Sequence, residues 1–322
     1  MLINMPGSDH EINYQIRPAK AIQRKMVCSL IKEIQLKGGL INFRYIGMGA
    51  KFFADFVLMH NQFGIKKMLS IEAQSESQLR YDFNKPLGFI EMKYGYSYEI
   101  LPQVENWNEQ NNLVWLDYDG PFIDKVLDDI NTTVINAHSG DMLLITVNSS
   151  VGGEKKSDKQ EKMRENLGKY FDESISLNRY TNKQLPQVES EIMMKTVNKC
   201  LYEKKRLHDI ELSAEQLLCI TYQDSAPMMT VAILFSETKL SKKISYLSLK
   251  KKMPFISNSQ EIFQLQVPSL TNKEIQFILK EMPINYDEYS PEKFNGIDIN
   301  EIKQFEAIYR YYPYYIESTF AT

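Results

Sequence analysis

The chain has 322 residues and a net charge of −3, from 38 Lys and Arg residues against 41 Asp and Glu residues. Hydrophobic residues make up 43% and charged residues 25%, which excludes a chain that is disordered over most of its length. The near balance of charge excludes a global positive field that would collect nucleic acid or an anionic membrane. The length suits one large domain with an appendage, or two domains.

Cysteine usage and the apolar runs indicate a compartment. Cys28, Cys200 and Cys219 lie far apart and lack metal-binding spacing, so we expect buried thiols in a reducing compartment. Residues 1–16 mix charged side chains into any apolar run, which argues against a signal peptide. No apolar stretch reaches the roughly 18 residues that a membrane helix needs. We therefore expect a cytoplasmic protein without membrane contact.

Helix and strand patterns alternate over the first half of the chain. A helix with one apolar stripe is predicted from Arg17 to the glycine pair that follows Lys37. Strands are predicted at 41–46, 67–72, 88–93, 113–116 and 142–147, with further helices at 51–63 and 123–134. Strands that alternate with helices predict a parallel sheet with right-handed crossovers.

The pattern changes in the second half. Helices are predicted at 155–171 and at about 186–207, and two strands at 217–222 and 228–235 form an antiparallel hairpin. A further strand is predicted at 244–249. Capping boxes that start at Thr271 and Asp298 predict two late helices.

A glycine turn is the sharpest local feature. Gly47 and Gly49 separate the first strand from the next helix, and Glu72 ends the second strand. Glycines allow the backbone to approach a ligand closely, and a carboxylate at that strand end binds the hydroxyls of a ribose. Phe52 stands where a dinucleotide fingerprint needs a third glycine, so we expect a nucleoside cofactor without a pyrophosphate. The alternative is a plain tight turn with Glu72 as a loop cap.

Two acids follow the fourth strand. The carboxyl ends of strands in an open α/β sheet face the ligand crevice, so Asp117 and Asp119 are candidate catalytic residues that accept a proton. The alternative for Asp119 is to cap the helix that follows Pro121. Asn148 ends the fifth strand, and with Asp117 it would supply oxygen ligands for Mg²⁺. The alternative for Asn148 is a turn residue.

The stretch from about 43 to 149, with the hairpin at 217–235, resembles the class I S-adenosylmethionine-dependent methyltransferase superfamily as a divergent O-methyltransferase-like member. The resemblance implies S-adenosylmethionine as cofactor, with the glycine turn under its methionine part, Glu72 on the ribose, and residues near Tyr94 and Gly95 beside the adenine. The cofactor-binding residues that it implies are Tyr45, Gly47, Met48, Gly49, Lys51, Glu72, Ala73, Gly95 and Asp117.

The resemblance also implies an α/β fold, with a Rossmann-like methyltransferase sheet that is mostly parallel and ends in an antiparallel hairpin. We expect an N-terminal helical lid at 1–40, the sheet domain at 41–236 and a C-terminal α+β extension at 237–322. The expected function is methyl transfer from S-adenosylmethionine to an oxygen or nitrogen nucleophile, with Asp117 or Asp119 orienting or deprotonating the acceptor. That acceptor is a small molecule or a macromolecule.

Two alternatives stay open. Tyr45 stands where the superfamily usually has an acid, which favours a catalytically degenerate interaction module that binds a protein partner through its C-terminal extension and the Tyr-rich stretch 309–315. The basic cluster Arg17, Lys20, Arg24 and Lys25 would serve a nucleic-acid-modifying enzyme by contacting phosphates. Such cations also form a solvated helix face, so nucleic acid is not the favoured partner.

Overall fold

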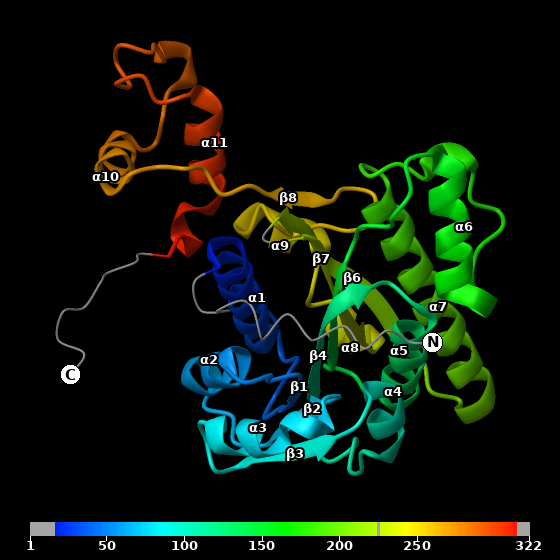
Figure 1. Ribbon diagram of the computed structural model, residues 1–322. Coiled ribbons are helices and arrows are strands. Elements are labelled where there is room, and N and C mark those ends of the chain that lie inside the picture. The colour runs from blue at the N-terminus through cyan, green and yellow to red at the C-terminus, as the bar shows by residue number, and fades with distance from the viewer. Residues whose placement is uncertain (1–16, 224–225, 314–322) are drawn as a thin grey trace.

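A mostly parallel sheet is the centre of the protein. The computed structural model describes residues 17–223 and 226–313. Its strands are β1 (Arg44–Gly47), β2 (Met68–Glu72), β3 (Ile90–Tyr94), β4 (Asn112–Pro121), β5 (Met142–Asn148), β6 (Ser213–Gln223), β7 (Pro227–Ser236) and β8 (Phe263–Leu265). They form one sheet in the order β3-β2-β1-β4-β5-β7-β6-β8 (Figure 1). β1 to β5 run parallel, and β7 lies antiparallel between β5 and β6, which confirms the expected sheet and its hairpin.

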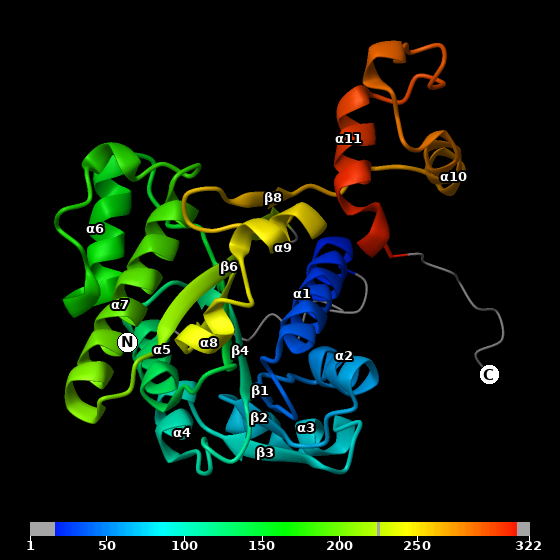
Figure 2. The same cartoon turned by 180° about the vertical axis from the view of Figure 1, so that it is seen from behind.

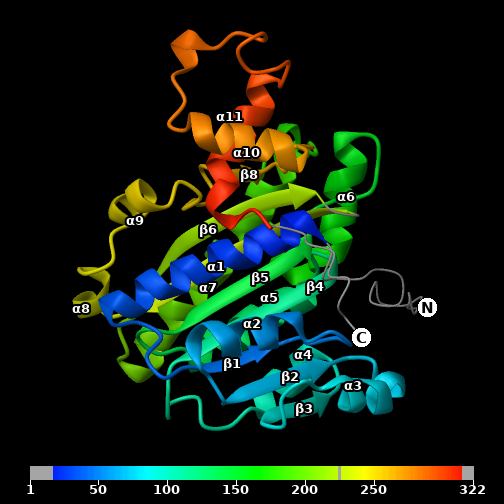
Figure 3. The ribbon, with the colours of Figure 1, turned by 90° about the vertical axis from the view of Figure 1, so that its left-hand side faces the viewer.

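Helices cover both faces of this sheet. They are α1 (Pro18–Lys37), α2 (Ala54–Phe63), α3 (Gln78–Asn84), α4 (Ser97–Ile100), α5 (Asp124–Asn136), α6 (Lys156–Leu167), α7 (Leu185–His208), α8 (Thr238–Ser241), α9 (Tyr246–Lys252), α10 (Asn272–Glu281) and α11 (Ile299–Ile308). α1 lies across one face, and α5 and α7 cover the other (Figures 2 and 3). None of the described helices is long and apolar enough to cross a membrane.

The central strands are apolar on both sides, because both faces are covered. Leu113 and Trp115 of β4 pack toward α1, whereas Val114 and Leu116 pack toward α5. This alternation follows the two-residue period of a strand. Burial on both faces explains why the sequence of β4 reads as a continuous apolar run instead of alternating with polar residues.

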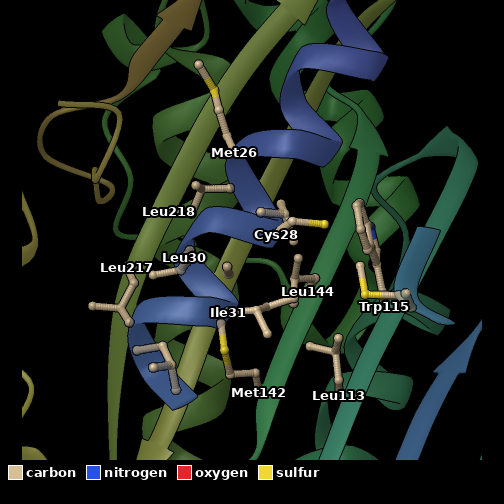
Figure 4. Packing of buried hydrophobic residues seen from close by; sticks show 14 of the residues in the cluster. Met26, Cys28, Leu30, Ile31, Leu113, Trp115, Met142, Leu144, Leu217 and Leu218 are labelled. Carbon is tan, nitrogen blue, oxygen red and sulfur yellow. The ribbon is translucent and has the colours of Figure 1, made fainter. Parts of the chain in front are cut away.

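α1 is part of the main core. Pro18 begins the helix, and Gly38 ends it in the left-handed conformation. Figure 4 shows Ile31 directed at Met142 and Leu144 of β5. The apolar stripe that predicted this helix therefore lies against the sheet, and the residues assigned to a lid at 1–40 include a helix whose inner face is fully buried.

The strand predicted at 244–249 is wrong. Ser245 instead caps α9, because its hydroxyl accepts a hydrogen bond from the Ser248 backbone N–H. The local apolar residues suited either element, and Ile244 and Leu249 are the buried residues of this segment. The end of a helix at Lys252 also places three lysines near the negative end of the helix dipole.

The C-terminal segment forms a small unit that stands away from the sheet (Figure 1). α10 and α11 share a core of their own, made by Ile275, Ile278, Phe294, Ile297, Ile302 and Phe305. The predicted capping box at Thr271 is confirmed, and Asp298 caps α11. Tyr311 returns to the main body, where its ring lies edge-on to Phe255 at 5.5 Å between centroids. Tyr314 and Tyr315 lie outside the described residues, and the domain boundaries stay a prediction.

Replacing Ile31 by alanine tests the packing of α1. Ile31 is fully buried between the helix and the sheet. We expect Ile31→Ala to lower the free energy of unfolding by about 2–5 kcal/mol, because the cavity cannot close. Leu36→Ala is the control, since this residue of the same helix is 78% exposed. Equal losses for the two variants in guanidinium unfolding would show that α1 does not pack as described.

Candidate functional site

A cavity of about 810 Å³ lies at the carboxyl ends of the parallel strands. It opens where β1 has β2 on one side and β4 on the other, the point at which the strand order reverses. Ligands bind at such a switch point in open α/β sheets. The volume falls within the range of about 300–1,000 Å³ that is usual for small-molecule sites.

The cavity gathers most of the residues that the sequence assigned to a cofactor, together with Asp119. Those that line it are Met48, Gly49, Glu72, Ala73, Gly95 and Asp117. Tyr45, Gly47 and Lys51 are not among the lining residues. Tyr45 is buried in the core on the α1 side, with its ring edge-on to Phe56 at 4.8 Å. A side chain at Gly47 would meet the Tyr45 hydroxyl within 2.6 Å, so that glycine serves internal packing.

Glu72 ties the glycine turn to the end of β2. Its Oε1 accepts hydrogen bonds from the backbone N–H of Gly49 at 2.7 Å and of Ala50 at 3.1 Å. The Ser70 hydroxyl donates to the same oxygen at 2.6 Å. The carboxylate is thus held rigidly in the cavity wall. Sequence reasoning missed Ser70, although a polar residue two positions before Glu72 on the same strand face signals such a partner.

Two cations of α1 pair with acids that line the cavity. We call the part of the lining formed by Asp55 and Asp117 the floor of the cavity. Lys20 Nζ lies 2.6 Å from Asp117 Oδ1 and 3.2 Å from the Tyr222 hydroxyl. Arg24 pairs with Asp55, and both line the cavity. Burial is the largest single effect on the pKa of Lys20 and lowers it, but Asp117, Tyr222 and Asp55 together outweigh burial and the net pKa is raised. Both cations therefore stay charged.

Burial of Lys20 and Arg24 contradicts both interpretations of the basic helix for these two residues. Lys20 is 3% exposed and Arg24 is 8% exposed, so neither belongs to a solvated face and neither can contact a phosphate backbone. A sequence pattern alone does not distinguish the two cases, because Asp117 lies 97 residues away along the chain. Of Arg17, Lys20, Arg24 and Lys25, only Lys25 is exposed, and its Nζ lies 3.4 Å from the carbonyl oxygen of Tyr312.

Asp119 does not cap the following helix. α5 begins after Ile123, with Asp124 as its first residue, so that interpretation is wrong. Asp119 instead lies in the last part of β4, exposed at the cavity, where the pairing with β5 shifts between Asp117 and Pro121. Such irregularities bend a strand and change the direction of its side chains, and this one spans Asp119.

The sequence analysis did not predict a buried hydrogen-bond network that lies behind the part of the cavity wall formed by Ser97 and Tyr118. Ser97 and Tyr118 line the cavity, and both hydroxyls donate to Asp129 Oδ2 at 2.5 Å. Asp129 belongs to α5 and is fully buried. Burial raises the pKa of Asp129 to about 6, although the two hydroxyl hydrogen bonds oppose the rise. The three residues come from three elements, so no local pattern points to them.

The possible magnesium ligands are engaged within the protein. Asp117 pairs with Lys20, and Asn148 Oδ1 accepts hydrogen bonds from the N–H and hydroxyl of Ser150. Across 17–223 and 226–313, no group of three or more His, Cys, Asp or Glu side chains could hold a metal ion. The alternative with Mg²⁺ is therefore not supported, and Asn148 is the turn residue of the other interpretation.

Replacing Lys20 by methionine tests the buried ion pair. The change leaves the Asp117 carboxylate without its partner at a position whose side chain is only 14% exposed. We expect Lys20→Met to lower the free energy of unfolding by about 3 kcal/mol, because an uncompensated charge stays buried. Lys25→Met on the same helix should change it by less than about 0.5 kcal/mol. Chemical unfolding in which Lys20→Met behaves like Lys25→Met would contradict the pair.

Comparison with known proteins identifies the family to which the chain belongs. A protein-family profile described as "Putative O-methyltransferase" matches residues 12–320. Among solved structures, cofactor-bound Rv0187 from MTB is 14% identical, with 69% of this chain and 80% of that chain covered and a TM-score of 0.35. N-methyltransferase NodS from Bradyrhizobium japonicum WM9 with S-adenosyl-L-homocysteine is 8% identical, with 69% and 90% covered and a TM-score of 0.38.

A complex of LepI with SAM is 10% identical, with 64% of this chain covered and a TM-score of 0.36, and the chain spans 46% of LepI. No curated protein matches the sequence significantly. The family profile covers nearly the whole chain, including the C-terminal extension. The protein therefore belongs to this O-methyltransferase family.

Proposed function

We propose that the protein transfers a methyl group from S-adenosylmethionine to an oxygen nucleophile. The observation that carries the proposal is the cavity at the strand switch point, with Glu72 locked against the glycine turn in its wall. A rigid carboxylate there suits a ribose diol, which gives charge-assisted hydrogen bonds. Membership of the O-methyltransferase family supports oxygen as the accepting atom.

The residues of the cavity fit the whole cofactor. The backbone from Met48 to Ala50 would pass under the methionine part, next to Glu72 at the ribose. The wall at Gly95 and Ser97 would hold the base. A side chain at Gly49 would meet the Phe53 ring and the Ser70 hydroxyl, and one at Gly95 would meet Ile100 at 3.1 Å, so both glycines allow the turns that form the cavity lining to pack closely. The bound cofactor would thus reach from the floor of the cavity, near α1, to the wall at Ser97 on α4.

Asp117 and Asp119 have different surroundings, so we assign them different roles in the reaction. The sulfonium of the bound cofactor supplies the activated methyl group. Asp117 is already paired with Lys20, so it would orient groups at the floor instead of taking a proton. Asp119 is exposed at the cavity mouth, where its carboxylate would accept the proton that the acceptor hydroxyl loses. The chain otherwise contributes proximity and orientation.

Glu72→Gln tests the cofactor assignment. The amide keeps the size but removes the charge and replaces one acceptor oxygen by a donor. We expect at least about a tenfold loss of affinity for S-adenosylhomocysteine in isothermal titration, equivalent to about 1.4 kcal/mol. Glu76→Gln, an exposed acid that follows the same strand, should bind as the parent does. Unchanged affinity in folded Glu72→Gln would overturn the ribose assignment, and no heat with the folded parent would overturn the cofactor.

Asp119→Asn tests the oxygen acceptor. Phenols, catechols and alcohols are offered with S-adenosylmethionine, each beside its amine analogue, and release of S-adenosylhomocysteine is measured. We expect hydroxyl compounds to react, and Asp119→Asn to lower kcat by about 10²-fold or more while S-adenosylhomocysteine affinity stays unchanged. Reaction with the amines alone would refute the oxygen assignment. A full kcat in Asp119→Asn would refute its role as proton acceptor.

A further inference from the structure

The buried carboxylate of Asp129 dictates how two hydroxyls of the cavity wall are oriented. Ser97 Oγ and the Tyr118 hydroxyl each lie 2.5 Å from Asp129 Oδ2, and the two hydroxyl oxygens lie 3.4 Å apart. A hydroxyl has one proton and two lone pairs, and an ionised carboxylate only accepts hydrogen bonds. Both protons are therefore committed to Asp129.

The cavity consequently meets two acceptors at this wall. With their protons directed at Asp129, Ser97 and Tyr118 can offer only lone pairs to a ligand. Asp129 itself does not line the cavity, and it is fully buried behind the two hydroxyls. The charge acts on a ligand through the two residues that it orients, without touching that ligand.

We propose that Asp129 is a positioning residue that makes this wall accept hydrogen bonds and so selects a cofactor base that carries an amino group. The proposal rests on the proposed function, because it requires the base of the cofactor to lie at this wall. An exocyclic amine donates hydrogen bonds to the two hydroxyl oxygens. A base with a carbonyl at the same position would set lone pairs against lone pairs and leave buried acceptors unpaired.

Protonation of Asp129 provides a second way to test the role. The charged and titratable groups that face it are Tyr118 on β4, Asp128 and Lys125 on α5, and Tyr98 on α4. A protonated Asp129 can itself donate, which frees a hydroxyl proton to turn into the cavity. Because the pKa of Asp129 lies at about 6, selection by the wall should weaken as the pH falls through that value.

The experiment compares two ligands on the full chain. Isothermal titration measures S-adenosylhomocysteine and its deaminated analogue, whose base carries a carbonyl in place of the amine. We expect the parent to prefer the amino base by at least about tenfold near pH 8, and the preference to shrink toward about pH 5. Asp129→Asn removes the charge, so its preference should fall to less than about threefold and should no longer vary with pH.

Asp128→Asn is the matched control. It makes the same chemical change one residue earlier on α5, at a side chain that does not line the cavity and pairs with Tyr170, Lys125 and Lys169. We expect it to keep the parent preference near pH 8 and to keep a pH dependence, whose midpoint moves to lower pH because the charge of Asp128 contributes to the raised pKa of Asp129. If Asp129→Asn also keeps both, Asp129 does not position the wall and the inference is overturned.

Two further outcomes separate the inference from the proposed function. If the folded parent binds neither ligand, the cofactor assignment fails. If it binds both equally, the cofactor assignment stands and the selection by this wall is refuted. Should Asp129→Asn fail to fold, Ser97→Ala and Tyr118→Phe each remove one hydroxyl, and each should lower the preference by at least about threefold. Unchanged preference in both would equally refute the inference.

Discussion

The meeting of opposite charges beneath the cavity is the constraint on which the arrangement of the site depends. Asp117 belongs to the central strand β4 and Asp55 to the helix after the glycine turn, and both acids converge on a place with little water. Lys20 and Arg24 compensate them from α1. A buried pair is weak evidence for net stability, but breaking one is costly. α1 is therefore held at one position along the sheet, and the floor of the cavity is fixed with it.

The fold was largely predictable because its signals are local. Alternating apolar strands and helices, the turn at Gly47 and Gly49, and the cap at Thr271 each depend on neighbours in sequence. The exception at 244–249 is a short apolar run that suits a strand or a helix, and the capping hydroxyl of Ser245 decides between them. Such choices rest on a single side chain, which a pattern does not weigh.

The site was predictable only where the backbone topology fixes it. Strand ends meet at one edge, so Glu72, Asp117 and Asp119 could be expected near one another. The partners of these groups could not be expected, because Lys20 and Asp117 lie 97 residues apart. A helix with cations on one side reads as a solvated face unless buried acids are known to lie opposite. The cluster around Asp129 has the same origin, since the fold alone brings its three elements together.

The position of α1 also has a consequence for biosynthesis. The helix is synthesised before every strand of the sheet, yet Lys20 contacts the Tyr222 hydroxyl, 202 residues later in the chain, and Gln23 contacts Thr230. At translation rates of about 5–20 residues per second, its apolar stripe waits on the order of ten seconds or more for the hairpin that completes its docking surface. Until the hairpin is made, the nascent chain thus carries a helix whose apolar face is only partly covered, by β4 and β5.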